Sequence, residues 1–547
     1  MLETVKAFSA LSEEFVELFM RHHPVQATGW GIHDYDHQLP NDSPEGMRER
    51  VVWLRDLEQR LVASVPWQEL PLEHRIDYAQ LRAKIAALRA NLEEIRMHQR
   101  NPAIYPETAL KGIFLLMARP FAPLEERKEA ILARMIAVPD YLEAARANLQ
   151  TVPDIYFGVA SDINLSGPLF VEEVMRTLLK SFPAEAERIE HAAERARVGF
   201  LQYQEFMDKE LEKRVGGTFA IGERWMNFKL EREHLLDLDC TALEELGRDQ
   251  IDGTRRLLEE EAKKIDASRS WRDLVQEAKK RHPEPLRLRD AYAAEVDRAR
   301  RFTEEHGLAP LPPGEKLNVI DTPVFERMTT PYAAYLPPAP FDEDQTGHFY
   351  VTPIDMSRRK EEQEQQLEGH NYASLPLVTL HETFPGHHLQ LCHANRTGGR
   401  LRKLADSDVF TEGWALYCED LMYEQGFFLD PLTRIVQLRD LLWRACRVVI
   451  DVGLHTGRMT FMQAVDYLIE QAMIERINAL IEVKRYTMTP TQPMSYLVGK
   501  LEILGIRDEA MQRLGSRFDL YEFHAQLVAS GSLQPTLVRE ELWERLR

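Results

Sequence analysis

A run of histidines and one glutamate marks residues 377–393, LVTLHETFPGHHLQLCH. His381 is followed at once by Glu382, and His387 and His388 come a few residues later. A histidine beside a glutamate, with a further histidine downstream, is how zinc hydrolases place a metal ligand next to the general base that takes a proton from water. The segment therefore predicts a zinc site for hydrolysis.

The spacing departs from the common HExxH pattern, because Pro385 stands where the second histidine would be. On a straight helix His387 would point roughly 120° away from His381, while His388 would share its face about 10 Å further along. Proline cannot donate the helical hydrogen bond and clashes with the preceding turn. We therefore expect a break at 384–386 that brings His387 back to the metal.

A third ligand is needed, and VFTEGWALYCEDLMYEQG offers Glu412 on a following helix, among apolar neighbours. The alternative is that Glu412 and Glu419 are solvated helix carboxylates. Cys392 and Cys418 lie near both motifs, and structural zinc sites often use cysteine as a fourth ligand. A cysteine or His388 in the fourth position would indicate a non-catalytic zinc-stabilised scaffold.

Hydrolysis of an acyl carbonyl also needs a hydrogen-bond donor for the negative charge that develops on its oxygen. Tyr496, in TPTQPMSYLVGK between a proline-rich turn and Gly499, is our candidate. A tyrosine buried only for packing is the alternative.

Four other residues are candidates for catalysis or substrate contact. His455 follows Asp451 by four residues, so on a helix the carboxylate is positioned to orient the imidazole, although a satisfied core pair is an equal alternative. Arg485, beside Tyr486, offers a bidentate partner for a substrate carboxylate, or a salt bridge to a helix carboxylate. We also count Tyr486 and His388 as substrate-binding candidates.

Amphipathic helices must position these residues, because apolar side chains recur every three or four positions over most of the chain. Ser374 and Pro376 predict a cap and first turn for the helix that enters at Leu377. Residues 308–353 instead are rich in proline and β-branched or aromatic residues, which predicts loops and strands. Residues 347–353, GHFYVTP, suggest either a sheet edge for an extended peptide or a structural hairpin.

Composition narrows the partners of the 547-residue chain. Its formal charge of −20, with both signs mixed, disfavours binding to nucleic acid. No apolar stretch approaches the length of a membrane span, and no signal peptide is evident at the N-terminus. Four cysteines without a CxxC pair fit a reducing compartment, so we expect a cytoplasmic protein with free thiols.

Several motifs in order resemble one known family, the bacterial domain-of-unknown-function family 885, which is related to gluzincin metallopeptidases. The resemblance covers almost the whole chain. Its motifs are HPVQATGWGIHDYDHQLP (23–40), HETFPGHHLQ, TEGWALYCE, RVVIDVGLHTGRMT, RYTMTPTQPMSYLVGK and FHAQLVASGSLQP.

The resemblance implies a mostly α fold: a large multi-helical, metallopeptidase-like body with a central cleft and a small strand element near 345–353. It implies zinc ligands His381, His387 and Glu412, with Glu382 as base, and it favours His387 over His388. It also implies one family-wide domain over 1–547, which we divide into a helical half (1–307) and a catalytic half (308–547).

The expected function is therefore zinc-dependent hydrolysis of peptide or related amide bonds, with short peptides as substrates. Two alternatives stay open. One is the non-catalytic zinc-stabilised scaffold or ligand-binding protein, and the other is a metallohydrolase for a non-peptide amide or ester, since the same groups would serve any acyl carbonyl.

Overall fold

A computed structural model gives the structure of residues 2–323, 327 and 332–546. Contacts within the chain divide it into two compact units. Unit 1 comprises Met1–Ile221 and Ala339–Asp344, and unit 2 comprises Gly222–Pro338 and Gln345–Arg547. Residues 222–307 fall within the expected N-terminal half, but they belong to the unit that carries the histidine motif.

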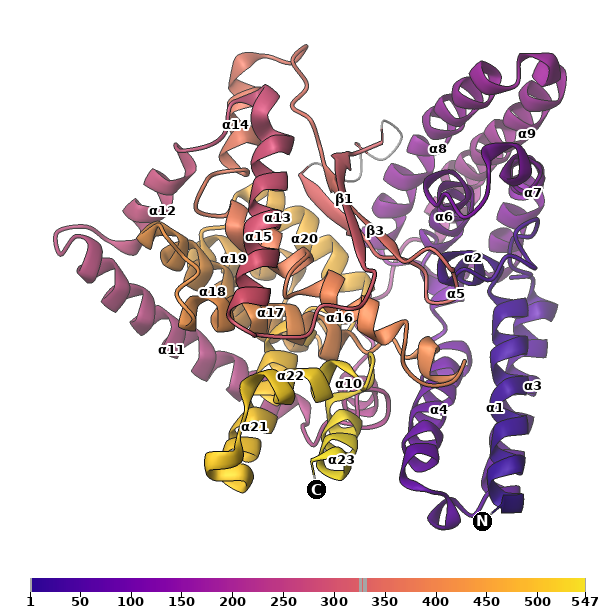
Figure 1. Cartoon of the computed structure of the whole chain (residues 1–547). Coiled ribbons are helices and arrows are strands. Elements are labelled where there is room, and N and C mark those ends of the chain that lie inside the picture. Colours follow the sequence, from indigo (N-terminus) through magenta and orange to yellow (C-terminus); the bar gives the residue numbers. More distant parts are fainter. Residues whose placement is uncertain (1, 324–326, 328–331, 547) are drawn as a thin grey trace. The chain divides into compact units, whose positions relative to one another are not determined.

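Helices make up almost all of unit 1 (Figure 1). Within this unit α9 packs against α7 and α8, and α1 packs against α3 and α4. The helices are α1 (Leu2–His22), α2 (Pro24–Trp30), α3 (Pro44–Ser64), α4 (Leu72–Ala90), α5 (Met97–Arg100), α6 (Ile104–Ala118), α7 (Leu124–Asn148), α8 (Asp154–Ser181) and α9 (Ala186–Phe206).

Unit 2 surrounds α18 (Pro431–His455) with further helices. Asp430 caps α18 by accepting the backbone N–H of Leu432, and every residue from Ala445 to His455 is buried. The second half of α18 is thus covered on all faces and lies in the core of the unit.

The other α-helices of unit 2 precede the sheet, carry the histidine motif, or follow one of the two. They are α10 (Glu223–Phe228), α11 (Cys240–Ile265), α12 (Trp271–Lys279), α13 (Leu288–Glu305), α14 (Lys360–Glu368), α15 (Leu375–Glu382), α16 (His387–Ala394), α17 (Asp408–Glu424), α19 (Phe461–Ala472), α20 (Arg476–Met488), α21 (Ser495–Leu514), α22 (Leu520–Val528) and α23 (Pro535–Arg545). The mostly α fold with a small strand element is confirmed.

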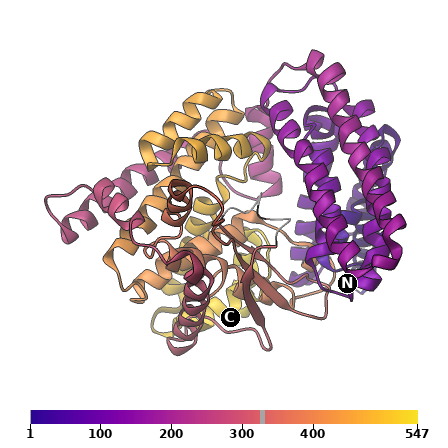
Figure 2. The ribbon, with the colours of Figure 1, turned by 90° about the horizontal axis from the view of Figure 1, so that it is seen from above.

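Three short strands form one sheet in unit 2, and Figure 2 shows them from above. They are β1 (Lys316–Asp321), β2 (Ala333–Leu336) and β3 (Thr346–Val351), in the order β1-β3-β2. β3 pairs in parallel with β1 and antiparallel with β2. The expected strand at GHFYVTP exists as β3, which lies between β1 and β2. Its backbone groups pair with both neighbours, so β3 does not offer a free edge to a peptide. Residues 324–326 and 328–331 of the predicted loop-and-strand segment lie outside the described residues.

The helix with the first histidine begins at Leu375, two residues before the expected start. Ser374 does not cap it, because its hydroxyl donates to the carbonyl of Asn371 (3.1 Å). Instead the side-chain oxygen of Asn371 accepts the backbone N–H groups of Ala373 (3.1 Å) and Ser374 (2.9 Å). Among the described helices, none combines the length and apolarity needed to cross a bilayer.

Candidate metal centre

The histidine motif is split into two helices, as its proline predicts. α15 ends at Glu382 and α16 begins at His387, with an irregular turn between them. The carbonyl of Pro385 in this turn accepts the indole N–H of Trp414 from α17 (2.9 Å). A side chain at Gly386 would overlap the carbonyl oxygens of Leu380 and His381. Glycine is therefore required where the chain folds back on the end of α15.

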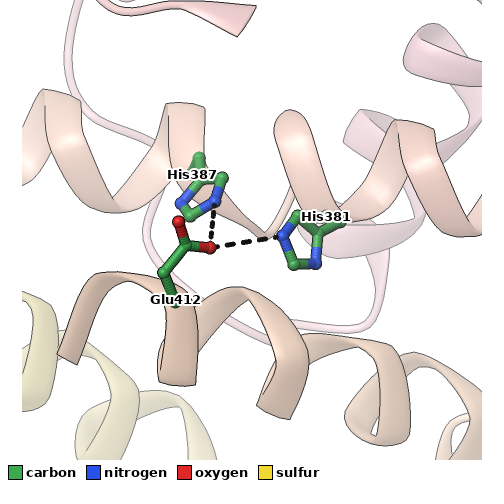
Figure 3. Close-up of side chains that lie close together, drawn as sticks. All are labelled: His381, His387 and Glu412. Carbon is green, nitrogen blue, oxygen red and sulfur yellow. Dashed lines mark ion pairs between the residues drawn. The ribbon is translucent and has the colours of Figure 1, made fainter. Parts of the chain in front are cut away.

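This turn brings His387 to the same place as His381, with Glu412 facing both from α17 (Figure 3). Glu412 Oε2 lies 3.3 Å from His387 Nε2 and 3.7 Å from His381 Nε2. One potential ligand atom from each of the three residues lies within 4.8 Å of the others. Two imidazoles and a carboxylate around one point form a donor set that suits zinc.

A second carboxylate, that of Glu419, contacts His381 through the ring nitrogen that faces away from Glu412. Glu419 Oε1 lies 2.9 Å from His381 Nδ1, and Glu419 is only 3% exposed. This bond leaves His381 Nε2 directed toward Glu412. Zinc-binding histidines commonly have such a partner, which sets the ring orientation and tautomer. The sequence carried a signal for it, because Glu419 follows Glu412 by two helical turns and so lies on the same helix face.

The charges of the cluster suit a cation. Burial alone would lower the pKa of His381, but Glu412 and Glu419 together raise it to about 10. Burial would raise the pKa of Glu412, but the two histidines hold it well below its usual range. The metal-free cluster thus carries an ionised Glu412 and binds a proton on His381, which a metal ion would displace.

Replacing Glu419 tests its supporting role. We expect Glu419→Gln to weaken zinc binding about 10- to 100-fold, because the amide cannot stabilise the charge on the His381 ring. Competition with a coloured zinc chelator measures the affinity. Glu424→Gln, an exposed change on the same helix, should leave it unaltered. Equal zinc affinity in both variants would show that the Glu419 contact does not tune the site.

α17 and α21 cross with their backbones in contact beside the cluster. A Cβ atom at Gly499 would overlap the carbonyl oxygen of Val409, and one at Gly413 would overlap the backbone of Gly499. Glu412 is adjacent to this crossing on α17, and Tyr496 lies one turn before it on α21. The two glycines therefore set the separation of Glu412 and Tyr496.

The Tyr496 ring lies almost parallel to the His381 ring, with 6.5 Å between their centroids and 19° between their planes. Burial, and secondarily the charge of Glu412, raises the pKa of Tyr496 to about 12. Its hydroxyl is therefore protonated at neutral pH and is able to donate a hydrogen bond. This agrees with the predicted place of Tyr496 beside the site, although its catalytic role stays a prediction.

The helix crossing should be intolerant of even one methyl group. We expect Gly499→Ala to lower the free energy of unfolding by about 1–3 kcal/mol, because the added carbon meets backbone that cannot rotate away. Gly505→Ala on the same helix meets nothing within 4 Å. It should be neutral or stabilising by up to about 1 kcal/mol. Denaturant titration of both variants measures the difference, and equal stabilities would contradict the close crossing.

His388 faces away from the cluster. It is fully buried, with Nδ1 2.7 Å from the Tyr335 hydroxyl and Nε2 3.3 Å from Glu315 Oε2. These contacts tie α16 to β2 and to the residue before β1, so a substrate contact by His388 is not what the structure indicates. Cys392 Sγ lies 3.7 Å from His388 Nδ1, and Cys418 Sγ donates to the carbonyl of Pro385 at 3.6 Å. Among the described residues neither thiol joins the metal-ligand cluster.

His455 is buried at the end of α18 and is held by a different partner from the one expected. Its Nε2 lies 3.0 Å from the carbonyl oxygen of Tyr486. The distance to Asp451 Oδ1 is 3.8 Å, which is longer than a hydrogen bond, and that oxygen accepts the backbone N–H of Thr491 instead. The expectation that Asp451 hydrogen-bonds to the imidazole and orients it is therefore wrong. Both residues are buried, but they do not form the hydrogen-bonded pair that the core alternative assumed either.

Tyr486 and Arg485 lie together on α20. Tyr486 is fully buried, and its hydroxyl accepts N–H groups of Arg447 (2.8 Å) and Trp443 (3.2 Å). Arg485 donates to Glu482 (3.0 Å) and to Gln492 (2.7 Å). The helix salt bridge considered for Arg485 is present. Arg447 was missed in the sequence, where it reads as one more arginine of an apolar helix.

The family model for bacterial proteins of unknown function, DUF885, matches residues 24–542. The chain belongs to this family. No curated protein matches its sequence. The resemblance of the sequence motifs to DUF885 is thus confirmed. A relation to gluzincin peptidases stays a prediction.

Two solved structures share the fold of this DUF885 chain. One, from Shewanella oneidensis, is described as a "putative lipoprotein of unknown function"; it has 22% identity, covers 99% of this chain and 100% of its own, and has a TM-score of 0.81. The other, a "putative lipoprotein" from Colwellia psychrerythraea, has 18% identity, covers 99% of each chain and has a TM-score of 0.84. The cytoplasmic location that we expected gains no support from relatives so described.

Proposed function

We propose that this DUF885 protein is a zinc-dependent hydrolase of peptide or related amide bonds and that its site is of the gluzincin type. The observation that carries the proposal is the three-donor cluster of His381, His387 and Glu412, which among the described residues has no fourth protein ligand. Catalytic zinc sites keep one position for water or substrate, whereas structural sites fill all four with protein groups. Cys392, Cys418 and His388, the fourth ligands that a scaffold would need, each have other partners.

A zinc ion held there would polarise an acyl carbonyl and lower the pKa of water. Glu382, the partly exposed last residue of α15 next to His381, is the proposed base that takes the proton from water and gives it to the leaving amine. Tyr496 is the proposed donor to the developing negative oxygen. Glu419 keeps the His381 ring in place through this sequence. Short peptides are the proposed substrates.

Metal removal tests this function directly. Elemental mass spectrometry of the purified protein should find about one zinc per chain, and the His381→Ala variant should lack it. A mixture of short peptides, followed by mass spectrometry, should be cleaved by the loaded protein. Cleavage should stop after chelation and return when zinc is added.

Two results would contradict the proposal. A protein that takes up no zinc has no metal mechanism at all. A protein that holds zinc but cleaves no peptide, amide or ester would match the scaffold alternative, in which the three ligands only join α15, α16 and α17.

A further inference from the structure

A pair of arginines lies near Tyr496, the tyrosine beside the metal cluster. Arg447 comes from α18 and Arg485 from α20, and we call them the arginine pair. The guanidinium carbon of Arg447 lies 4.8 Å from the centre of the Tyr496 ring. The same ring lies 6.5 Å from the His381 ring, centroid to centroid. Tyr496 is therefore a neighbour of both Arg447 and a proposed zinc ligand.

The two arginines share one carboxylate partner. Arg447 Nη2 (3.1 Å) and Arg485 Nη2 (3.0 Å) donate to the same oxygen, Oε2 of Glu482. Their remaining bonds go to neutral groups, the Tyr486 hydroxyl and the Gln492 amide. Asp451 also acts on Arg485, but its Oδ1 accepts the backbone N–H of Thr491. Among the hydrogen bonds of the two guanidiniums given above, Glu482 is the one carboxylate, and it is shared by both.

Arg447 also has a donor with nothing to bind. The residue is 5% exposed, and its Nη1 has no hydrogen-bond acceptor among the described atoms. Rings of Trp443 (4.4 Å) and Tyr496 (4.8 Å) cover the guanidinium. A buried donor without an acceptor is unfavourable, and more so when it is charged. An anion that supplied the acceptor would recover this energy.

The pair is open to a ligand on one side. The Arg485 side chain is 34% exposed and that of Glu482 is 21% exposed, whereas Arg447 is closed in. An anion that contacts Arg485 from solvent also lies near Arg447, because both guanidiniums bond to the same Glu482 oxygen. Neighbouring guanidiniums suit a carboxylate, because each presents parallel N–H groups.

We propose that Arg447 and Arg485 bind the terminal carboxylate of the substrate. The protein then selects peptides whose free α-carboxylate lies close to the scissile bond, as a carboxypeptidase or dipeptidase does. This inference rests on the proposed hydrolase function, because that function places the scissile bond at the cluster of His381, His387 and Glu412.

Binding without turnover tests the selection. The bait is immobilised, zinc-loaded Glu382→Gln protein, offered an equimolar pool of random tripeptides made as free acids and as C-terminal amides. Mass spectrometry of the bound fraction gives the ratio of acid to amide. We expect at least about tenfold enrichment of the free acids, because a site built for a charged hydrogen-bonding group discriminates strongly against its neutral analogue.

Adding Arg447→Met to the bait should bring the ratio to about one. Arg485→Met, at a partly exposed position, provides a second variant should the buried change unfold the chain. Arg444→Met is the matched control: it lies on the same helix, donates to the Asp440 carbonyl and should keep the full ratio. Circular dichroism and zinc content verify each bait.

A ratio near one in the unmodified bait, or a ratio that survives both arginine changes, overturns the inference. The kinetics of the wild type separate this failure from failure of the proposed function. Equal kcat/KM for acid and amide peptides would leave the hydrolase in place and remove the carboxylate site. If the bait enriches free acids but the wild type cleaves no peptide, the carboxylate site stands and the hydrolase function is removed.

Discussion

Glu382→Gln should retain about one zinc per chain and lose peptide hydrolysis by about 10²- to 10⁴-fold. The amide has nearly the same size as the carboxylate, but it cannot take a proton from water at neutral pH. Glu382 is not among the three residues whose ligand atoms cluster, so metal binding should survive the change. Initial rates on a peptide cleaved by the wild type, together with elemental analysis, measure both quantities.

The exposed Glu361→Gln change on α14 provides the control and should leave the rate unaltered. The loss should appear in kcat rather than in KM, because a base acts in the transition state and contributes little to binding of the ground state. A fully active Glu382→Gln protein would show that another group takes the proton and would remove the mechanism proposed for this site.

His387→Ala should lower the zinc content more than Glu419→Gln does. It removes one of the three donor groups, so the loss in zinc affinity should exceed the roughly 10- to 100-fold expected for Glu419, which touches only another ligand. The variant should purify without zinc, and added zinc should no longer raise its melting temperature, because only binding to the native state stabilises it.

His388→Ala is the matched comparison, since it changes the next residue of the same helix. It should keep its zinc and lose about 1–3 kcal/mol of stability, because Tyr335 and Glu315 lose a buried partner. Zinc loss in His388→Ala with retention in His387→Ala would reverse the assignment of the ligand.

The sequence was most informative where one residue has a local backbone consequence. Pro385 followed by Gly386 predicted the break between α15 and α16, and the break explains how a motif without HExxH brings two histidines together. Prolines and alternating residues likewise predicted the strands. The three predicted ligand residues come together, because local spacing and one following helix were enough to place them.

Features set by tertiary packing were harder to predict. The central position of β3 depends on pairing with β1 and β2 on both sides, which no pattern within GHFYVTP encodes. Asn371, rather than Ser374, uses its side-chain oxygen near the start of α15, and it accepts the N–H groups of the turn just before the helix. Arg447 appeared as one arginine in an apolar helix, and only the structure places it near Tyr496.

All four cysteines are free and buried, so we expect them to react slowly with thiol reagents. Burial raises the pKa of Cys240 to about 11 and of Cys392 and Cys446 to about 12, so few thiolates form near neutral pH. A cysteine introduced at an exposed site in each unit, such as Leu169→Cys and Met511→Cys, would therefore take up fluorophores against a dark background. Energy transfer between the two dyes would then follow the separation of the units as zinc and peptides are added, without removal of any native cysteine.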